Sequence, residues 1–259
     1  MTTSTTIILL LVILFGAVAQ DTNNDVNIEN CCNLGFRPSV FSEITNKPKQ
    51  YKLKNFCGNN QSTITKVYCD TITDGGGWLV VQRRIDGSVD FNRDWVDYED
   101  GFGTLPVDDQ ATTGEFWIGL YSLHCLTYQG HWVWELRIDY TFTNGTKGYL
   151  SYSNFRVGPA TGQYLLTISG FDGVKTDPIT GAHILNGMKF TTRDRDNDGY
   201  GLNCAVHNHG RNAGGWWYNF CSLIHPNHQY NHGETIHLNN RWFPLPFIEI
   251  KIRPMNCII

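Results

Sequence analysis

The chain has 259 residues, of which 17% are charged and 13% are aromatic, including eight tryptophans. Disordered chains combine high charge with few aromatic residues, so this composition excludes a disordered protein. The net charge is −4, from 20 basic and 24 acidic residues, which leaves no basic field for nucleic acid or an anionic membrane. No heptad or Gly-x-y repeat is present, which excludes a coiled coil or a collagen.

The first 19 residues have the pattern of a secretory signal peptide. Residues 7–15 are uninterruptedly apolar, and residues 17–19, Ala-Val-Ala, are a small-x-small cleavage pattern. The alternative, a membrane anchor, would need roughly 18 apolar residues. We therefore expect residues 1–19 to be removed, residues 20–30 to form a flexible segment, and the protein to be secreted and extracellular.

Cysteines and glycosylation sequons agree with secretion. Eight cysteines remain after the predicted cleavage, an even number that an oxidising compartment would pair, although the sequence leaves the pairing open. No Cys-x-x-Cys pair supports zinc as the alternative use of these residues. N-glycosylation sequons begin at Asn60 and Asn144.

Residue periodicity predicts a few regular elements. Residues 78–85 are typical of a strand, and Phe91, Trp95, Tyr98 and Phe102 recur at nearly helical spacing, which predicts a short amphipathic helix. Further strands are expected at residues 133–140, where apolar and charged side chains alternate, at residues 164–169, and at the alternating isoleucines 248, 250 and 252.

No period survives between residues 191 and 245, which are rich in Asn, His, Gly and Asp. A long irregular segment in a compact domain is usually either functional or disordered. The tryptophans and the two cysteines of this segment argue against disorder. We therefore expect the functional site here.

An acidic loop in this segment predicts calcium binding. Asp194, Asp196 and Asp198 alternate and are followed by Gly199, so several carboxylate oxygens can converge on one hard cation. An EF-hand is excluded, because Ala205 occupies the position of its bidentate acid and no flanking helices are predicted. A solvated acidic turn is the alternative.

The sequence gives little support for a zinc site or for enzymatic activity. Six of the nine histidines lie between His207 and His237, but Pro226 and Gly233 interrupt any shared helical face, so we expect loop and pocket histidines instead of a zinc site. Because no nucleophile elbow, P-loop or dinucleotide motif is present, the sequence predicts a protein that is not an enzyme.

A series of short segments follows a recognisable order: residues 67–70 (Val-Tyr-Cys-Asp), 73–78 (Thr-Asp-Gly-Gly-Gly-Trp), 82–91, 101–103, 114–119, 186–190, 194–198, 203–205, 215–217 and 251–254. Together they resemble the fibrinogen C-terminal domain family, which includes ficolins, tachylectin-type lectins and angiopoietins. The resemblance implies an α+β fold over residues 31–259, with a small N-terminal subdomain, a central twisted antiparallel sheet, and an irregular calcium-binding C-terminal subdomain.

The resemblance also implies a metal site and two disulfides. Calcium (Ca2+) would take the side chains of Asp196 and Asp198 and the carbonyls of Tyr200 and Leu202. One disulfide would join Cys204 to Cys221 beside this site, and another would join Cys69 to Cys31 or Cys32, with Cys32 the expected partner. Cys57, Cys125 and Cys257 have no family assignment and would form internal bridges or link chains.

The ligand pocket of acetyl-binding members has a cis peptide before the second site cysteine, here Phe220–Cys221. The residues expected to line the corresponding pocket are Trp216, Trp217, Phe220, Cys221, Ser222 and His209. Of the two indoles, we expect one buried and the other nearer the surface. Ser222 stands where the family usually has His, and His209 belongs to an apparent insertion at residues 207–211.

Two functions are consistent with this resemblance. The first is a secreted lectin of innate-immune type that binds acetylated or microbial glycans with calcium. The second is an extracellular ligand or matrix protein that engages a receptor or partner protein. Since a single glycan site binds weakly, a homo-oligomer is a further possibility to be tested.

Overall fold

The computed structural model describes residues 27–28, 31, 49–53, 66–107, 112–128, 132–173, 177–179, 185–207, 213–230 and 235–257. The predicted signal peptide, Cys32, Cys57, Asn60 and His209 lie outside the described residues.

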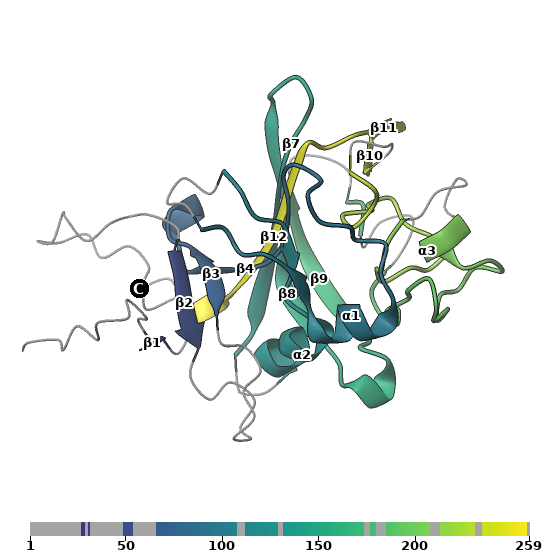
Figure 1. Ribbon diagram of the computed structural model, residues 1–259, viewed down its shortest axis with the longest axis horizontal. Coiled ribbons are helices and arrows are strands. Elements are labelled where there is room, and N and C mark those ends of the chain that lie inside the picture. Colours follow the sequence, from purple (N-terminus) through teal and green to yellow (C-terminus); the bar gives the residue numbers. More distant parts are fainter. Residues whose placement is uncertain are drawn as a thin grey trace, which may run out of the picture.

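A large, mainly antiparallel sheet dominates the fold (Figure 1). Its strands follow the order β1 (Asn27–Ile28), β2 (Lys49–Leu53), β3 (Val67–Asp70), β4 (Trp78–Arg84), β12 (Phe247–Pro254), β7 (Trp134–Thr141), β8 (Lys147–Val157) and β9 (Leu166–Gly173). Two short strands, β5 (Phe102–Gly103) and β6 (Phe116–Trp117), pair with each other beside β4, and β10 (Ile236–Leu238) pairs with β11 (Arg241–Phe243).

Helices are few and short. They are α1 (Trp95–Asp100), α2 (Leu120–Tyr128) and α3 (Cys204–His207), with 3₁₀ turns at Thr73–Gly75, Ala160–Gly162 and Met255–Cys257. Helix α2 packs against β8 and contacts α1. No helix in the described part of the chain is long and apolar enough to cross a membrane. The predicted α+β fold with a central antiparallel sheet is confirmed.

The predicted strands at residues 78–85, 133–140 and 248–252 are confirmed as β4, β7 and β12. In β7 the buried residues alternate with half-buried ones, as the sequence pattern predicts. Strand β12 lies between β4 and β7 and pairs antiparallel with both. The last strand of the chain is therefore the centre of the sheet.

The predicted helix is shorter than expected. Only Trp95 and Tyr98 lie in α1, whereas Phe91 precedes the helix and Phe102 belongs to β5. The sequence did not predict helix α2. Its polar residues Ser122 and Thr127 are buried beside its leucines, so the helix lacks the polar face by which an amphipathic helix is recognised. Strand β9 begins at Leu166 and continues past the predicted end at residue 169, to Gly173.

Aromatic rings join the irregular C-terminal region to the sheet core. Phe190 lies with its ring centroid 5.3 Å from that of Tyr98, 5.9 Å from Trp117 and 4.9 Å from Trp217. All four rings are buried. Because edge-to-face and tilted aromatic contacts add to the free energy of area burial, this cluster anchors the irregular region.

The disulfides correct one expectation. Cys204 pairs with Cys221 as expected, but Cys69 pairs with Cys31, so the expected partner Cys32 was wrong. Cys31 and Cys69 have Cα atoms 5.7 Å apart, within the ordinary range for a disulfide. Cys125 and Cys257 are also disulfide-bonded. No free cysteine is found in the part of the chain that the structure describes.

The face of the sheet opposite the core carries a buried ion network. The Lys251 ammonium lies 2.6 Å from Asp70 Oδ2, 2.7 Å from Asp139 Oδ2 and 2.9 Å from Glu249 Oε1. Lys251 is 2% exposed. Burial alone would raise the pKa of Asp70, but the ammonium outweighs burial and lowers it to about 2. The same three carboxylates raise the pKa of Lys251 against the effect of burial.

Replacing Lys251 with Met is expected to lower the free energy of unfolding at pH 7 by about 3–5 kcal/mol, because three buried carboxylates lose their cation. In the wild type, the depressed pKa of Asp70 means that its stabilisation is present above pH ~4 and is lost as the pH falls towards about 2. In the variant the carboxylate pKa values rise instead, so its stability is lost as the pH increases.

Urea unfolding between acid and neutral pH tests this expectation, with the exposed Lys189→Met as control. The difference between Lys251→Met and the wild type should be largest at neutral pH and shrink in acid. A constant difference across the pH range would contradict the electrostatic account and leave lost packing as the cause.

Candidate functional site

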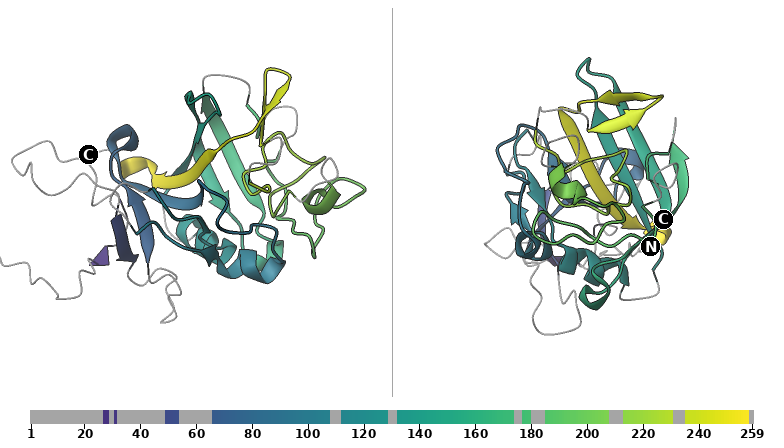
Figure 2. Two further views of the ribbon diagram at one scale, coloured as in Figure 1. Left: turned by 45° about the horizontal axis from the view of Figure 1, so that its top comes forward. Right: turned by 90° about the vertical axis from the view of Figure 1, so that its right-hand side faces the viewer.

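Two irregular stretches, residues 185–207 and 213–230, lie at the end of the molecule opposite β1 and β2 (Figures 1 and 2). They lie in the region where sequence periodicity is absent and a functional site is expected. Only the short helix α3 and isolated bridges interrupt them.

The first stretch contains the acidic loop, which its own side chains hold in shape. Asn197 Nδ2 donates to the carbonyl of Phe190 at 2.7 Å, and Asn203 Nδ2 donates to that of Thr192 at 2.9 Å. These bonds tie both ends of the loop to the buried residues that precede it. The loop conformation is therefore built into the chain.

The three aspartates have different surroundings. Asp194 Oδ1 accepts hydrogen bonds from the backbone N–H of Trp95, at the start of α1, and from the Thr192 hydroxyl. Asp198 accepts the backbone N–H of Tyr200 on one oxygen and that of Cys204 on the other, both at 2.8 Å. Asp194 thus docks the loop on α1, which leaves the later two aspartates for a cation.

Electrostatics make Asp198 receptive to a cation. Burial raises the pKa of Asp198, hydrogen bonds from Cys204 and Tyr200 oppose this, and the neighbouring Asp196 raises the pKa further. Asp196 Oδ1 accepts the Asp198 N–H at 3.2 Å, which brings the two carboxylates together. Two ionised carboxylates held this close repel each other unless a cation compensates them.

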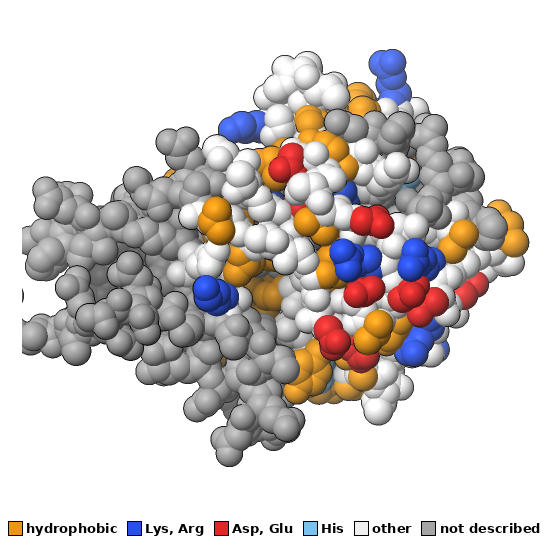
Figure 3. All heavy atoms as spheres, in the orientation of Figure 1, with side chains coloured by type: hydrophobic (Ala, Val, Ile, Leu, Met, Phe, Trp, Pro, Cys, Tyr) orange, Lys and Arg blue, Asp and Glu red, His pale blue; other side chains and the backbone are white. Residues whose placement is uncertain are grey.

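One ion pair and one cation–π contact fasten the loop to the start of α1. Arg193 Nε lies 2.6 Å from Asp94 Oδ1, and the Arg195 guanidinium lies 4.1 Å from the ring centroid of Trp95. On the face shown in the space-filling view, acidic and basic side chains intermingle around this region (Figure 3). The charges there pair with one another, so no field of a single sign forms.

The second stretch is tied directly to the acidic loop. Besides the Cys204–Cys221 disulfide, the N–H of Gly199 donates to the Asn219 carbonyl at 3.0 Å. Thr191 and Trp216 exchange a pair of backbone hydrogen bonds of 2.9 and 3.1 Å. We call the acidic loop, residues 194–204, and residues 216–222 the loop pair, since a disulfide and these bonds hold the two together.

Several expected pocket residues are buried. Trp216 is 3% exposed and Trp217 2%, so the expectation that one indole lies near the surface was wrong. Trp217 Nε1 donates to the Tyr164 carbonyl at 2.7 Å, which fixes its ring within the core. Ser222 is also buried, and its hydroxyl accepts the N–H of Ile224 at 3.1 Å.

The peptide between Phe220 and Cys221 is trans, since the described residues contain no cis peptide bond. The expectation of a cis bond here was therefore wrong. Cys221 instead has a φ of 57°, the left-handed conformation that residues with a Cβ rarely adopt. The Cys204 disulfide and the Asn219–Cys221 bridge hold it there.

Exposed apolar side chains mark the outer surface of the loop pair. Phe220 is 62% exposed, Leu202 54% and Tyr200 46%. The sequence analysis assigned only carbonyl oxygens to Tyr200 and Leu202 and missed their side chains. No sequence signal separates them, because exposure on an irregular backbone follows no period.

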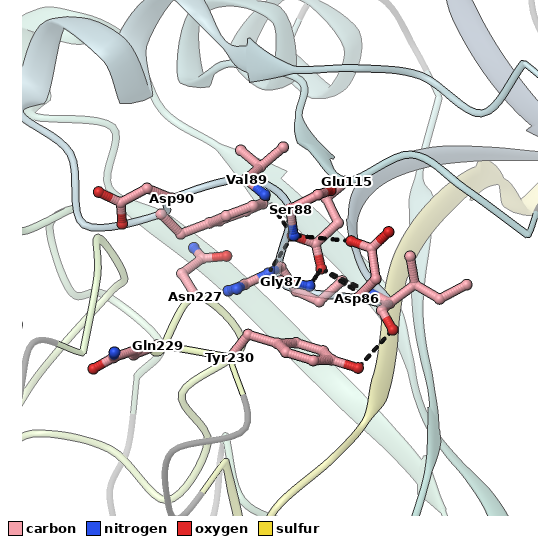
Figure 4. A network of polar contacts seen from close by, with 12 residues as sticks. Asp86, Gly87, Ser88, Val89, Asp90, Glu115, Asn227, Gln229 and Tyr230 are labelled. Atoms are coloured by element: carbon pink, nitrogen blue, oxygen red, sulfur yellow. Dashed lines mark hydrogen bonds and ion pairs between the residues drawn. The ribbon is translucent and has the colours of Figure 1, made fainter.

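A buried carboxylate, Glu115, anchors a turn that lies beside Asn227 and Tyr230 (Figure 4). Glu115, which is fully buried, accepts backbone N–H bonds from residues 85, 86, 87 and 89 and thereby closes a turn after β4. Arg84, 3.5 Å from Glu115 Oε2, donates to the His228 carbonyl at 2.7 Å. The Tyr230 hydroxyl donates to the Ile85 carbonyl at 2.6 Å, and the Pro246 carbonyl lies 2.9 Å from the same oxygen. Strand β4 thus holds residues 226–230 in place.

Two described histidines of this region, His225 and His237, are part of the packing. His225 is 1% exposed and stacks on Trp242 with ring centroids 5.3 Å apart, and His237 meets the same indole from another side at 5.1 Å. In the described ranges, no three His, Cys, Asp or Glu side chains converge to hold a metal. The expected calcium site has only two carboxylates, and its other two ligands are backbone carbonyls. It is therefore not a cluster of three such side chains.

Comparison with known proteins agrees with this geometry. A family model described as the C-terminal globular domain of fibrinogen beta and gamma chains matches residues 38–255. Fibrinogen-like protein A of Apostichopus parvimensis is 39% identical over 211 residues, which cover 79% of this chain and 68% of the relative. Fibrinogen-like protein 1 of Bos taurus is 40% identical, with 74% of this chain and 64% of the relative covered.

Fibrinogen C domain-containing protein 1-B of Xenopus laevis is 41% identical, with 73% of this chain covered. The match spans only 41% of that relative's length. Parts of such relatives therefore have no counterpart in the matched region, and their full activities do not transfer directly.

Solved structures share the fold. The fibrinogen-like globe domain of human ANGPTL6 superposes with a TM-score of 0.69 at 28% identity, covering 88% of this chain and 95% of that domain. The lamprey fibrin D-dimer, solved with the peptide Gly-His-Arg-Pro-amide, gives 0.72 at 30% identity, covering 93% and 79%. With its disulfides, the chain has the features of an extracellular ligand-binding protein, and it belongs to the family of fibrinogen C-terminal domains.

Proposed function

We propose that this protein is a secreted, non-catalytic recognition protein whose ligand binds at the loop pair, with calcium stabilising that site. The observation that carries the proposal is the exposure of Phe220, Leu202 and Tyr200 on backbone that a disulfide and hydrogen bonds hold rigid. Apolar side chains exposed on a preorganised surface favour binding, because little conformational entropy is lost when a ligand arrives.

The residues present fit a calcium ion. Asp196 and Asp198 supply hard oxygen donors, and each Asp198 oxygen uses one lone pair for a backbone N–H and retains another. The carbonyls of Tyr200 and Leu202 are the proposed remaining ligands. The raised pKa of Asp198 supports the same conclusion, because a bound cation would offset the repulsion from Asp196.

A glycan is the first ligand class that we propose. Exposed aromatic rings such as Phe220 and Tyr200 can stack on the apolar face of a sugar. The burial of Trp216 and Ser222 and the trans peptide before Cys221 mean that such a ligand would rest on the outer rim. The proposed glycan site therefore differs from the pocket that the resemblance to acetyl-binding members implies.

A receptor or partner protein is the second proposed class. The supporting observation is the likeness to the fibrin D-dimer, which was solved with a peptide ligand. The exposed apolar side chains suit a protein contact as well as a sugar.

The domain boundaries and modifications belong to the same proposal. Residues 1–19 would be a signal peptide, residues 20–30 a flexible segment and residues 31–259 the recognition domain. Asn144 is exposed in the turn between β7 and β8, so its sequon is accessible to glycosylation.

Calcium should raise the melting temperature of the wild type. At a concentration 100 times its dissociation constant, a bound ion adds about 2.7 kcal/mol to the free energy of unfolding. Asp196→Asn keeps a carbonyl oxygen for the Asp198 N–H but removes one negative charge. The variant should lose the calcium response, while its stability in chelator stays equal to or above that of the wild type.

Calorimetric scans in calcium and in chelator measure both effects. Asp172→Asn, at an exposed aspartate on β9 whose side chain makes no hydrogen bond or ion pair in the described structure, is the matched control and should respond to calcium as the wild type does. A wild type whose melting temperature ignores calcium would refute the metal site.

Phe220→Ala should abolish ligand binding without a loss of stability, because this side chain is mostly exposed. The measurement is retention on acetylated resin in calcium, followed by separate elution with N-acetylglucosamine and with chelator. Val107→Ala, also at an exposed apolar residue, is the control.

Elution by the sugar, lost in Phe220→Ala only, would support the glycan. Retention that Phe220→Ala leaves intact would place binding elsewhere and contradict the proposed site. A calcium-stabilised wild type that is not retained would favour the protein ligand.

A further inference from the structure

A recess of about 730 Å³ lies over the polar face of the central sheet, away from the loop pair. Strands β3, β4, β12, β7 and β8 supply most of its lining, and no residue of the loop pair contributes to it. The residues that matter for its chemistry are Lys147, Tyr149, Arg137, Asp139, Phe247 and Lys251.

The charges at the floor of the recess balance one another. Lys251 has three N–H groups, and three carboxylates surround it at 2.6 to 2.9 Å. Two of those carboxylates also have a second cation, since Glu249 pairs with Arg83 and Asp139 with Arg137, each at 2.8 Å. Three acids are thus balanced by three bases, and the floor by itself attracts neither a cation nor an anion.

The rim adds one positive charge that no acidic side chain in the described ranges balances. Lys147 is exposed, lines the recess and makes no ion pair in the described structure. Nearby, the Arg137 guanidinium lies 4.0 Å from the Tyr149 ring centroid, and its Nη1 is 3.8 Å from the exposed carboxylate of Asp74. Asp139 takes the Nε–H of Arg137, but the long contact of Nη1 to an exposed acid is weak, so the outer N–H groups can still donate to another anion. The recess is therefore positive, although the whole chain has a net charge of −4.

We propose that this recess binds an acidic saccharide, whose anionic group lies between Lys147 and Arg137. A sugar hydroxyl both donates and accepts hydrogen bonds, and here an acceptor and a donor lie side by side in Asp139 and Arg137. Asp139 Oδ2 is buried beside Lys251, whereas Oδ1 accepts one bond, from Arg137, and keeps a lone pair for a hydroxyl. Tyr149 and Phe247 add the aromatic walls that are common in carbohydrate sites.

The sheet geometry disfavours an acidic peptide as the occupant. Strands β4, β12 and β7 are each paired on both sides, so their backbone groups are used within the sheet. A peptide lying on this face cannot add as a strand and would be held by side chains alone. A saccharide needs no backbone pairing.

The test uses the full secreted chain and two matched disaccharides: glucuronate linked to N-acetylglucosamine, and the neutral dimer of N-acetylglucosamine. Titration calorimetry should show tighter binding of the acidic sugar, and added salt should weaken it. Lys147→Gln should weaken acidic-sugar binding about fivefold, the effect of one partly exposed ion pair. Lys147→Arg should restore it.

Lys189→Gln is the control, because it removes one exposed positive charge outside the recess and leaves the same net charge as Lys147→Gln. It should bind the acidic sugar as the wild type does. Equal weakening by both variants would reduce the effect to net charge and overturn the proposal, as would equal affinity for the two sugars.

Two further arms separate this recess from the loop pair and from a peptide site. Phe220→Ala should bind the acidic sugar as the wild type does. Loss of binding at the loop pair would therefore not affect the recess, and loss of binding at the recess would not affect the loop pair. A short Glu-rich peptide is the third probe. If it bound more tightly than the sugar and lost affinity in Lys147→Gln, the recess would be a peptide site and the saccharide assignment would be wrong.

Discussion

The position of β12 between β4 and β7 is the constraint on which the rest of the structure depends. A C-terminal strand at the centre of a sheet joins the strands made early in the chain to those made late. The Lys251 ammonium secures this arrangement, because it contacts Asp70 on β3, Glu249 on its own strand and Asp139 on β7. Buried charges of this kind tolerate only one register, since a shift of one residue would turn the ammonium into the apolar core.

The place of the proposed ligand site follows from that topology. After β9 the chain leaves the edge of the sheet and must return to its centre as β12, and the residues in between form the irregular region (Figure 1). Phe190 and Trp217 anchor this excursion in the core, while Cys204–Cys221 and the Gly199–Asn219 bond close it on itself. Because a rigid scaffold supports such loops, it holds their recognition residues in fixed positions.

The two faces of the sheet differ in their chemistry. One face packs the hydrophobic core, and the other carries charges that are balanced in the interior and positive at the rim near Lys147. The fold therefore offers two chemically different surfaces. The loop pair presents exposed apolar side chains, whereas the recess presents paired donors and acceptors.

Much of this protein could be predicted from its sequence, and the rest could not for physical reasons. Ordered motifs determined the family, alternation determined β7, and the spacing of the acidic loop indicated calcium chemistry. Tertiary structure alone decided that Cys31 and not Cys32 meets Cys69, because neighbouring cysteines are equivalent until the chain is packed. It also decided that both indoles are buried while Phe220 is exposed, since irregular backbone has no period from which a face can be read. Likewise, charged residues that alternate with isoleucines, as in β12, are typical of a solvent-exposed face. Here the flanking strands bury them, and ion pairs neutralise their charge.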